Sequence, residues 1–134
     1  MRDRLWWCVT ALSGALVVMA GAFGAHVLEG QLSLRLMAAF ETAVRYQAWH
    51  TLAMLAVLAW RAACPLAGQA LALGLWTAGI ALFSGSLYAM ALLEVAGLGR
   101  ITPLGGLLLI AGWLALAACA LRAGPGDQSE SGST

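Results

Sequence analysis

Residues 62–93 read AACPLAGQALALGLWTAGIALFSGSLYAMALL, a run with no Asp, Glu, Lys or Arg. A charged side chain costs a few kcal/mol at the centre of a bilayer, so such a run is typical of a membrane-spanning segment. About 20 helical residues cross the hydrocarbon core. Leu and Ala, which are strong helix formers, dominate the run, and it lacks the period-2 alternation of a barrel strand. The stretch therefore predicts a transmembrane helix.

Three further gaps between charged residues extend this prediction to the whole chain. They cover residues 5–28, 46–60 and 101–121, and the second gap is too short to span a bilayer unless its helix begins earlier. We therefore predict an all-α membrane protein, an antiparallel bundle of four transmembrane helices in a single domain, residues 1–122. The expected spans are about 5–27, 42–62, 66–92 and 102–122, with an amphipathic segment over residues 33–44 before the second span.

The composition supports this class and excludes others. The chain has 134 residues, of which 62% are hydrophobic and 10% are charged, whereas about 25% are charged in soluble domains. A net charge of +1 without a basic stripe argues against a nucleic-acid partner. The three cysteines are isolated and have no metal-ligand spacing. Residues 123–134, AGPGDQSESGST, form a polar tail that we expect to be flexible.

The polar stretch FETAVRYQAWH, residues 40–50, opens the second span. On a helical wheel its polar residues take up most of the circumference, so this turn must face headgroups, water or other helices. Alternating spans bring it to the same membrane face as the end of the first span and the end of the third. The candidate polar cluster on this face is His26, Glu41, Arg45, Tyr46, Gln47, His50 and Tyr88.

The chemistry of this cluster is open. We favour structural hydrogen bonds for the two histidines over a proton relay, and a relay over metal or haem ligation, because two histidines alone are a weak metal signal. Glu41 and Arg45 are spaced to pair along a helix. We expect Ser84 and Ser86 to bond across to another helix or back to a carbonyl, since a serine nucleophile would need a base and GxSxG is absent. No catalytic, cofactor-binding or metal-binding residue is predicted, and no cofactor.

Small residues recur at helical spacing within the runs and predict close helix packing. Lipid gives no hydrophobic drive between helices, so backbones must approach closely. The predicted helix-packing residues are Gly14, Gly21, Ala25, Gly74, Ala81, Gly85, Gly105 and Gly112. Their neighbours belong either to this chain, which we favour, or to another chain.

Four ordered motifs resemble a known family. GAFGAH (21–26), VRYQAWHTLAML (44–55), LFSGSLY (82–88) and ITPLGGLLLIAGW (101–113) are similar to domain-of-unknown-function family 423. These are small bacterial inner-membrane proteins similar to eukaryotic transmembrane protein 256. The resemblance covers about residues 5–122 and implies a four-helix membrane protein, with no established activity, cofactor or catalytic residue. Val27 and Arg100 depart from the family pattern, in which small residues are expected.

Two functional hypotheses follow. The first is a non-enzymatic accessory subunit or homo-oligomer of the bacterial plasma membrane, whose partners are the lipid bilayer and other membrane proteins or itself. The second is a small conduit or carrier for protons, ions or a lipid headgroup, which requires a water-accessible cavity reaching His50.

Arginine counts favour both termini on the cytoplasmic side. An N-terminal signal peptide is the alternative for residues 1–25, which we disfavour because the apolar stretch is long.

Overall fold

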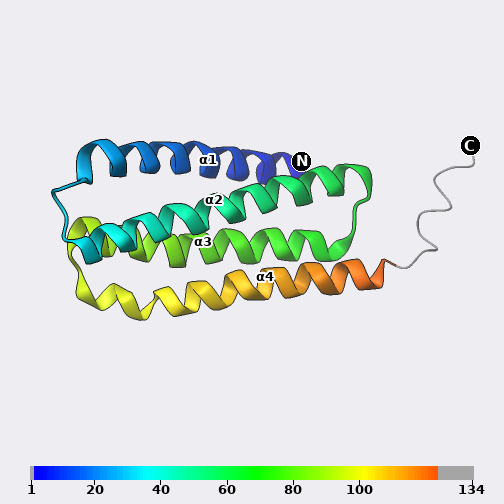
Figure 1. Ribbon diagram of the computed structural model, residues 1–134. Helices are drawn as coiled ribbons and strands as arrows, with labels where there is room; N and C mark the ends of the chain where they lie inside the picture. Colours follow the sequence, from blue (N-terminus) through cyan, green and yellow to red (C-terminus); the bar gives the residue numbers. More distant parts are fainter. Residues whose placement is uncertain (1, 124–134) are drawn as a thin grey trace, which may run out of the picture.

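The computed structural model describes residues 2–123, which form four long helices without strands in that range. Helix α1 (Arg2–Phe23) continues into a π-helical turn, η1 (Gly24–Leu28). Helix α2 (Leu34–Ala63) and helix α3 (Ala67–Leu93) follow, then a 3-10 turn, η2 (Ala96–Arg100), and helix α4 (Thr102–Arg122). Consecutive helices run in opposite directions (Figure 1). Apart from Ala123, the polar tail expected at residues 123–134 lies outside the described residues.

Helix α2 differs most from the sequence prediction. The amphipathic segment expected before the second span is the first part of a single continuous helix of 30 residues. Ser33 caps this helix by accepting a hydrogen bond from the backbone N–H of Leu36 at 3.3 Å. The segment is continuous with the span because residues 34–63 contain neither Gly nor Pro to interrupt the helix.

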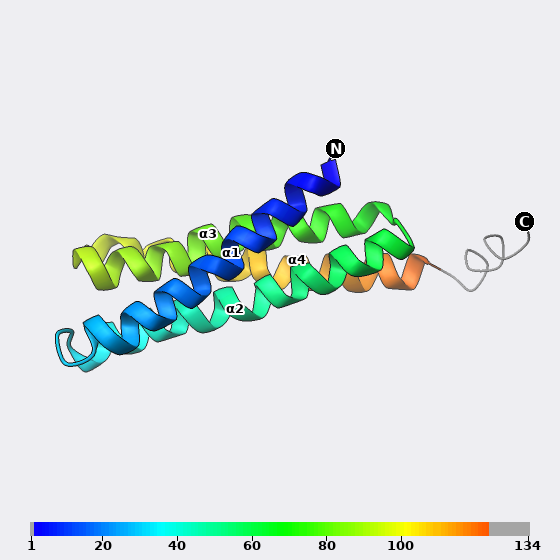
Figure 2. The same cartoon turned by 90° about the horizontal axis from the view of Figure 1, so that it is seen from above.

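Three segments of the described chain are long and apolar enough to cross a membrane, where the sequence predicts four spans. They are Asp3–Leu28, Ala67–Leu93 and Gly97–Arg122. Helix α2 has the length, but Arg35, Glu41, Arg45 and Arg61 lower its hydropathy. Neighbouring helices cover two sides of it, because α1 packs against one side and α3 against another (Figure 2).

Helices α3 and α4 form the tightest pair. A Cβ added to Gly105 would overlap the backbone of Phe83, and one added to Gly112 would meet the ring of Trp76. The central core joins three helices through Met54, Val57, Leu58, Leu73, Trp76 and Leu109. A smaller cluster of Leu28, Phe40 and Ala91 closes the end where η1 lies. Helix α1 lies on the outside of the bundle and crosses over α2 at an angle (Figure 2).

Candidate functional site

The residues predicted as one polar cluster occupy four different places. Gln47 and Tyr88 meet between α1, α2 and α3, whereas His50 and Tyr46 face α3 and α4. Glu41 and Arg45 are exposed on the outside of α2, and among the side chains that the structure describes the one ion pair is Arg61–Asp3. His26 is exposed on η1.

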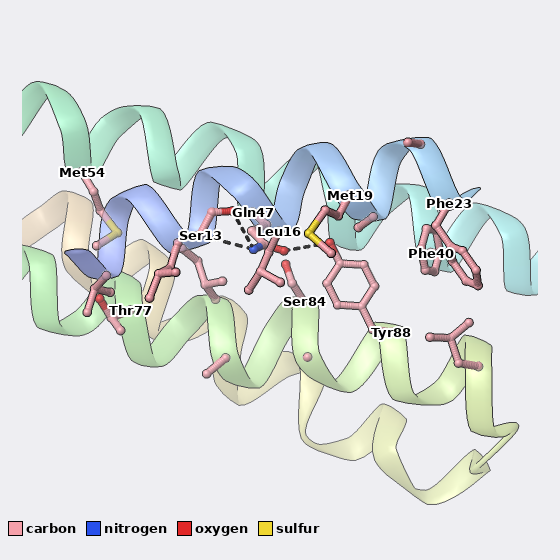
Figure 3. Close-up of a pocket in the computed structure, with 18 of the residues that line it drawn as sticks. Ser13, Leu16, Met19, Phe23, Phe40, Gln47, Met54, Thr77, Ser84 and Tyr88 are labelled. Carbon is pink, nitrogen blue, oxygen red and sulfur yellow. Dashed lines mark hydrogen bonds between the residues drawn. The ribbon is translucent and has the colours of Figure 1, made fainter. Parts of the chain in front are cut away.

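A hydrogen-bonded network links the first three helices through Gln47 (Figure 3). The Gln47 amide nitrogen donates to the Ser13 carbonyl at 3.3 Å and to the Ser13 hydroxyl at 3.2 Å. The Tyr88 hydroxyl donates to the Gln47 amide oxygen at 2.8 Å, and Ser13 shares a 2.7 Å hydrogen bond with Thr51. Gln47 is 4% exposed, so its polar atoms are satisfied by protein partners rather than by solvent.

Two serines of α3 add further links of the kind predicted from the sequence. The Ser84 hydroxyl donates to the carbonyl of Ala43 in α2 at 2.8 Å. Ser86 donates back to the Phe83 carbonyl at 2.9 Å and shares a 2.6 Å bond with Thr102 at the start of α4. Both hydroxyls therefore bond across to other helices, and neither has a histidine or carboxylate as a hydrogen-bond partner.

His50 lies in a separate aromatic cluster. The indole N–H of Trp113 donates to His50 Nε2 at 3.1 Å, and His50 Nδ1 lies 2.7 Å from the Tyr46 carbonyl. Because Nε2 accepts and Nδ1 faces a carbonyl, the arrangement matches the neutral imidazole with its proton on Nδ1. Trp76 packs edge-on against His50, with ring centroids 6.1 Å apart. His50 is thus a link between α2 and α4.

A long groove separates α1 from α3. Its volume is about 1030 Å³. Figure 3 shows the large side chains of α1, among them Leu16, Met19 and Phe23, on one side, and Gln47 with Tyr88 at its floor. His26 and Val27 line it near η1, but His50 does not line it. The cavity reaching His50 that a proton or ion conduit requires is therefore not provided by this groove.

Some of the predicted packing residues contact a neighbouring helix, and others do not. A Cβ added to Gly14 or Gly21 would lie 3.7 Å from Thr51 or 3.9 Å from Val44, both on α2. Gly74 faces Trp6 of α1 in the same way, at 3.8 Å. Gly105 and Gly112 pack tightly on α3, as described above.

The exceptions are Ala25, Ala81 and Gly85. Ala25 and Ala81 are exposed, and a Cβ added to Gly85 would meet nothing within 4 Å. Ala81 and Gly85 both line the groove between α1 and α3. The strip of small residues formed by Ala81 and Gly85 on α3, which we call the α3 seam, is therefore not covered by another helix of the described chain.

Four partners of the polar residues were not predicted as site residues: Ser13, Thr51, Trp76 and Trp113. Ser13 and Thr51 are hydroxyls in largely apolar runs, which is the signal that could have identified them. The two tryptophans each carry an indole N–H donor, which is a further clue, since an indole in a protein interior usually has an acceptor. Among residues 2–123, no three His, Cys, Asp or Glu side chains are grouped to hold a metal ion.

Comparison with known proteins assigns the family. Residues 20–106 match the family described as "Protein of unknown function (DUF423)". The chain belongs to this family. A UPF0382 membrane protein of Staphylococcus haemolyticus is 44% identical over 117 residues, covering 84% of this chain and 92% of that protein. The UPF0382 inner membrane protein YgdD of Escherichia coli is 37% identical over 127 residues, covering 91% and 93%.

A third relative, the UPF0382 membrane protein YwdK of Bacillus subtilis, is 37% identical over 113 residues, covering 84% of this chain and 92% of that protein. No solved structure matches the chain. The resemblance drawn from the four sequence motifs is thereby confirmed, and the chain is a member of a family of helical membrane proteins. The names of these relatives state a membrane location and no activity.

Proposed function

We propose that the chain is a four-span protein of the bacterial plasma membrane, with both termini cytoplasmic, and that it acts as a non-enzymatic accessory subunit. In this arrangement α2 crosses the membrane together with the three more apolar segments. Its 30 residues extend about 45 Å, which is more than the hydrocarbon core requires. Its inward-facing polar side chains, Gln47 and His50, have partners within the protein, which lowers the cost of placing them in lipid.

The free seam of small residues in α3 carries the proposal of a partner. Ala81 and Gly85 are four residues apart, the spacing at which helices approach closely in membranes. In α4 the equivalent seam is covered by α3, but no side chain of the described chain covers Gly85. We propose that a transmembrane helix of a partner protein, or of a second copy, packs on this seam between α1 and α3.

The matched pair Ala81→Leu and Ala118→Leu tests this function. Both alanines are exposed helical residues, but Ala81 lines the groove and Ala118 lies on the face of α4 away from α3. We expect Ala81→Leu to abolish the partner or dimer that copurifies in lipid nanodiscs and is detected by native mass spectrometry. Ala118→Leu should retain it. A wild-type protein that is a monomer without a partner, or two variants with the same behaviour, would refute the proposal.

A further inference from the structure

A second hollow lies between η1 and the first turns of α2, with a volume of about 720 Å³. It is lined by different residues of α1 and η1 from those that line the groove, and Phe40 is the one residue that the two share. The residues of α1 and η1 that line it include three small ones: Gly21, Gly24 and Ala25. Gly30, with a φ of +79°, turns the chain around its rim in a conformation that other residues rarely adopt.

Three charged side chains line this hollow: Glu29, Glu41 and Arg45. None of them forms an ion pair or a side-chain hydrogen bond with the described residues, although Glu41 and Arg45 are spaced to pair along the helix. At the opposite end of the same two helices, Asp3 and Arg61 do pair, at 2.9 Å. Two carboxylates and one guanidinium are thus available together to a ligand that carries both signs of charge.

The wall of the hollow that continues into the bundle is apolar. This apolar wall is formed by three side chains of α2: Met37, Phe40 and Val44. Beyond the hollow, Val18 lies on the same face of α1 as Gly21, and Leu52 lies two helical turns after Arg45 on α2. Val18 is 72% exposed and Leu52 is 64% exposed, so both offer apolar surface that a hydrocarbon chain can cover.

We propose that this hollow binds the headgroup of a zwitterionic phospholipid with a primary ammonium, phosphatidylethanolamine. The inference rests on the proposed four-span arrangement, in which the first apolar segment ends at Leu28 and Glu29 reaches the headgroup level. Arg45 binds the phosphate, because a guanidinium donates two parallel hydrogen bonds to phosphate oxygens. Glu29 and Glu41 accept hydrogen bonds from the ammonium, and the acyl chains lie along Val18 and Leu52.

The donor set distinguishes this headgroup from the two nearest alternatives. A primary ammonium offers three N–H donors to the two carboxylates, as a lysine side chain does. Phosphatidylcholine has the same charges, but its quaternary nitrogen has no N–H to donate. Phosphatidylglycerol lacks the cation, and its negative charge is repelled by the two carboxylates. A site of this kind should therefore bind phosphatidylethanolamine more tightly than phosphatidylcholine and phosphatidylglycerol.

Native mass spectrometry of the full chain in micelles with equal amounts of the three phospholipids tests the proposal. We expect wild type to retain phosphatidylethanolamine about tenfold better than phosphatidylcholine, since one charge-assisted contact is worth about that factor. Arg45→Gln should reduce this retention about tenfold, and Glu41→Gln should remove the preference over phosphatidylcholine. The matched control is Arg35→Gln, an exposed arginine of the same helix that does not line the hollow. It should behave as wild type.

Equal retention of the three lipids, or equal losses in the two arginine variants, would overturn the proposal. The Ala81→Leu variant separates it from the proposed docking function. We expect this variant to keep its lipid preference while it loses its protein partner, because Ala81 does not line the hollow. A monomeric wild type that still selects phosphatidylethanolamine would refute the docking function alone. Loss of the preference in Ala81→Leu would refute the hollow as the lipid site.

Discussion

The Gln47 network gives the sharpest test of how α1 is held in the bundle. Gln47 makes three hydrogen bonds to other helices: two to Ser13 of α1 and one from Tyr88 of α3. Hydrogen bonds between membrane helices contribute about 0.6 kcal/mol on average and at most about 1.7 kcal/mol. We therefore expect Gln47→Leu to lower the free energy of unfolding by about 2 kcal/mol and Tyr88→Phe to lower it by about 0.6 kcal/mol.

The assay is reversible unfolding by SDS in mixed micelles, followed by helical circular dichroism. The double variant should lose less than the sum of the two single variants, by about 0.6 kcal/mol, because the Tyr88–Gln47 bond is then removed only once. Gln31→Leu, at an exposed position outside the helices, is the control and should change the free energy by less than about 0.5 kcal/mol. A Gln47→Leu variant as stable as this control, or strictly additive single variants, would show that the network does not hold these helices together.

Two further predictions concern the other contacts of α3 and α4. Gly105→Ala should destabilise the protein by about 1–3 kcal/mol, because the added methyl group overlaps the Phe83 backbone, whereas Gly85→Ala should be neutral or slightly stabilising. Equal unfolding midpoints for these two variants would contradict the packing described here. Trp113→Phe removes the donor to His50 Nε2 and should cost about 0.6–1.7 kcal/mol, measured as a lower midpoint in the same titration. An unchanged midpoint would show that this bond is not formed.

Much of the helical layout follows from charge placement alone. Charged residues are costly in lipid, so the gaps between them locate α1, α3 and α4. For α2 the gap is short, and the helix extends beyond it because Ser33 provides a cap and residues 34–63 lack helix-breaking residues. Whether α2 crosses the membrane depends on what surrounds its polar side chains. Hydropathy cannot report this, because it is calculated from the sequence and the surroundings are set by tertiary contacts.

The polar cluster shows the same limit at the level of single residues. At about 100° per residue, Glu41 and Arg45 point one way, Tyr46 and His50 a second way, and Gln47 a third way. The wheel therefore already separates the three directions that the structure shows. It cannot name the residues met in each direction, because these lie far away along the chain; Trp113, for example, is 63 residues from His50.

The two halves of the bundle are held by different forces, and this bears on which helix a partner engages. Helices α3 and α4 approach through Gly79, Gly105 and Gly112, where backbone and ring contacts leave no space. Helix α1 is held by the hydrogen bonds of Ser13, by the Asp3–Arg61 pair and by Trp6 and Val9, which pack half-buried against the core, and most of its large side chains are exposed. A few polar bonds are weaker than continuous close packing in lipid, where no hydrophobic drive brings helices together. The partner helix that we propose for the groove would therefore reposition α1 at lower cost than it would separate α3 from α4.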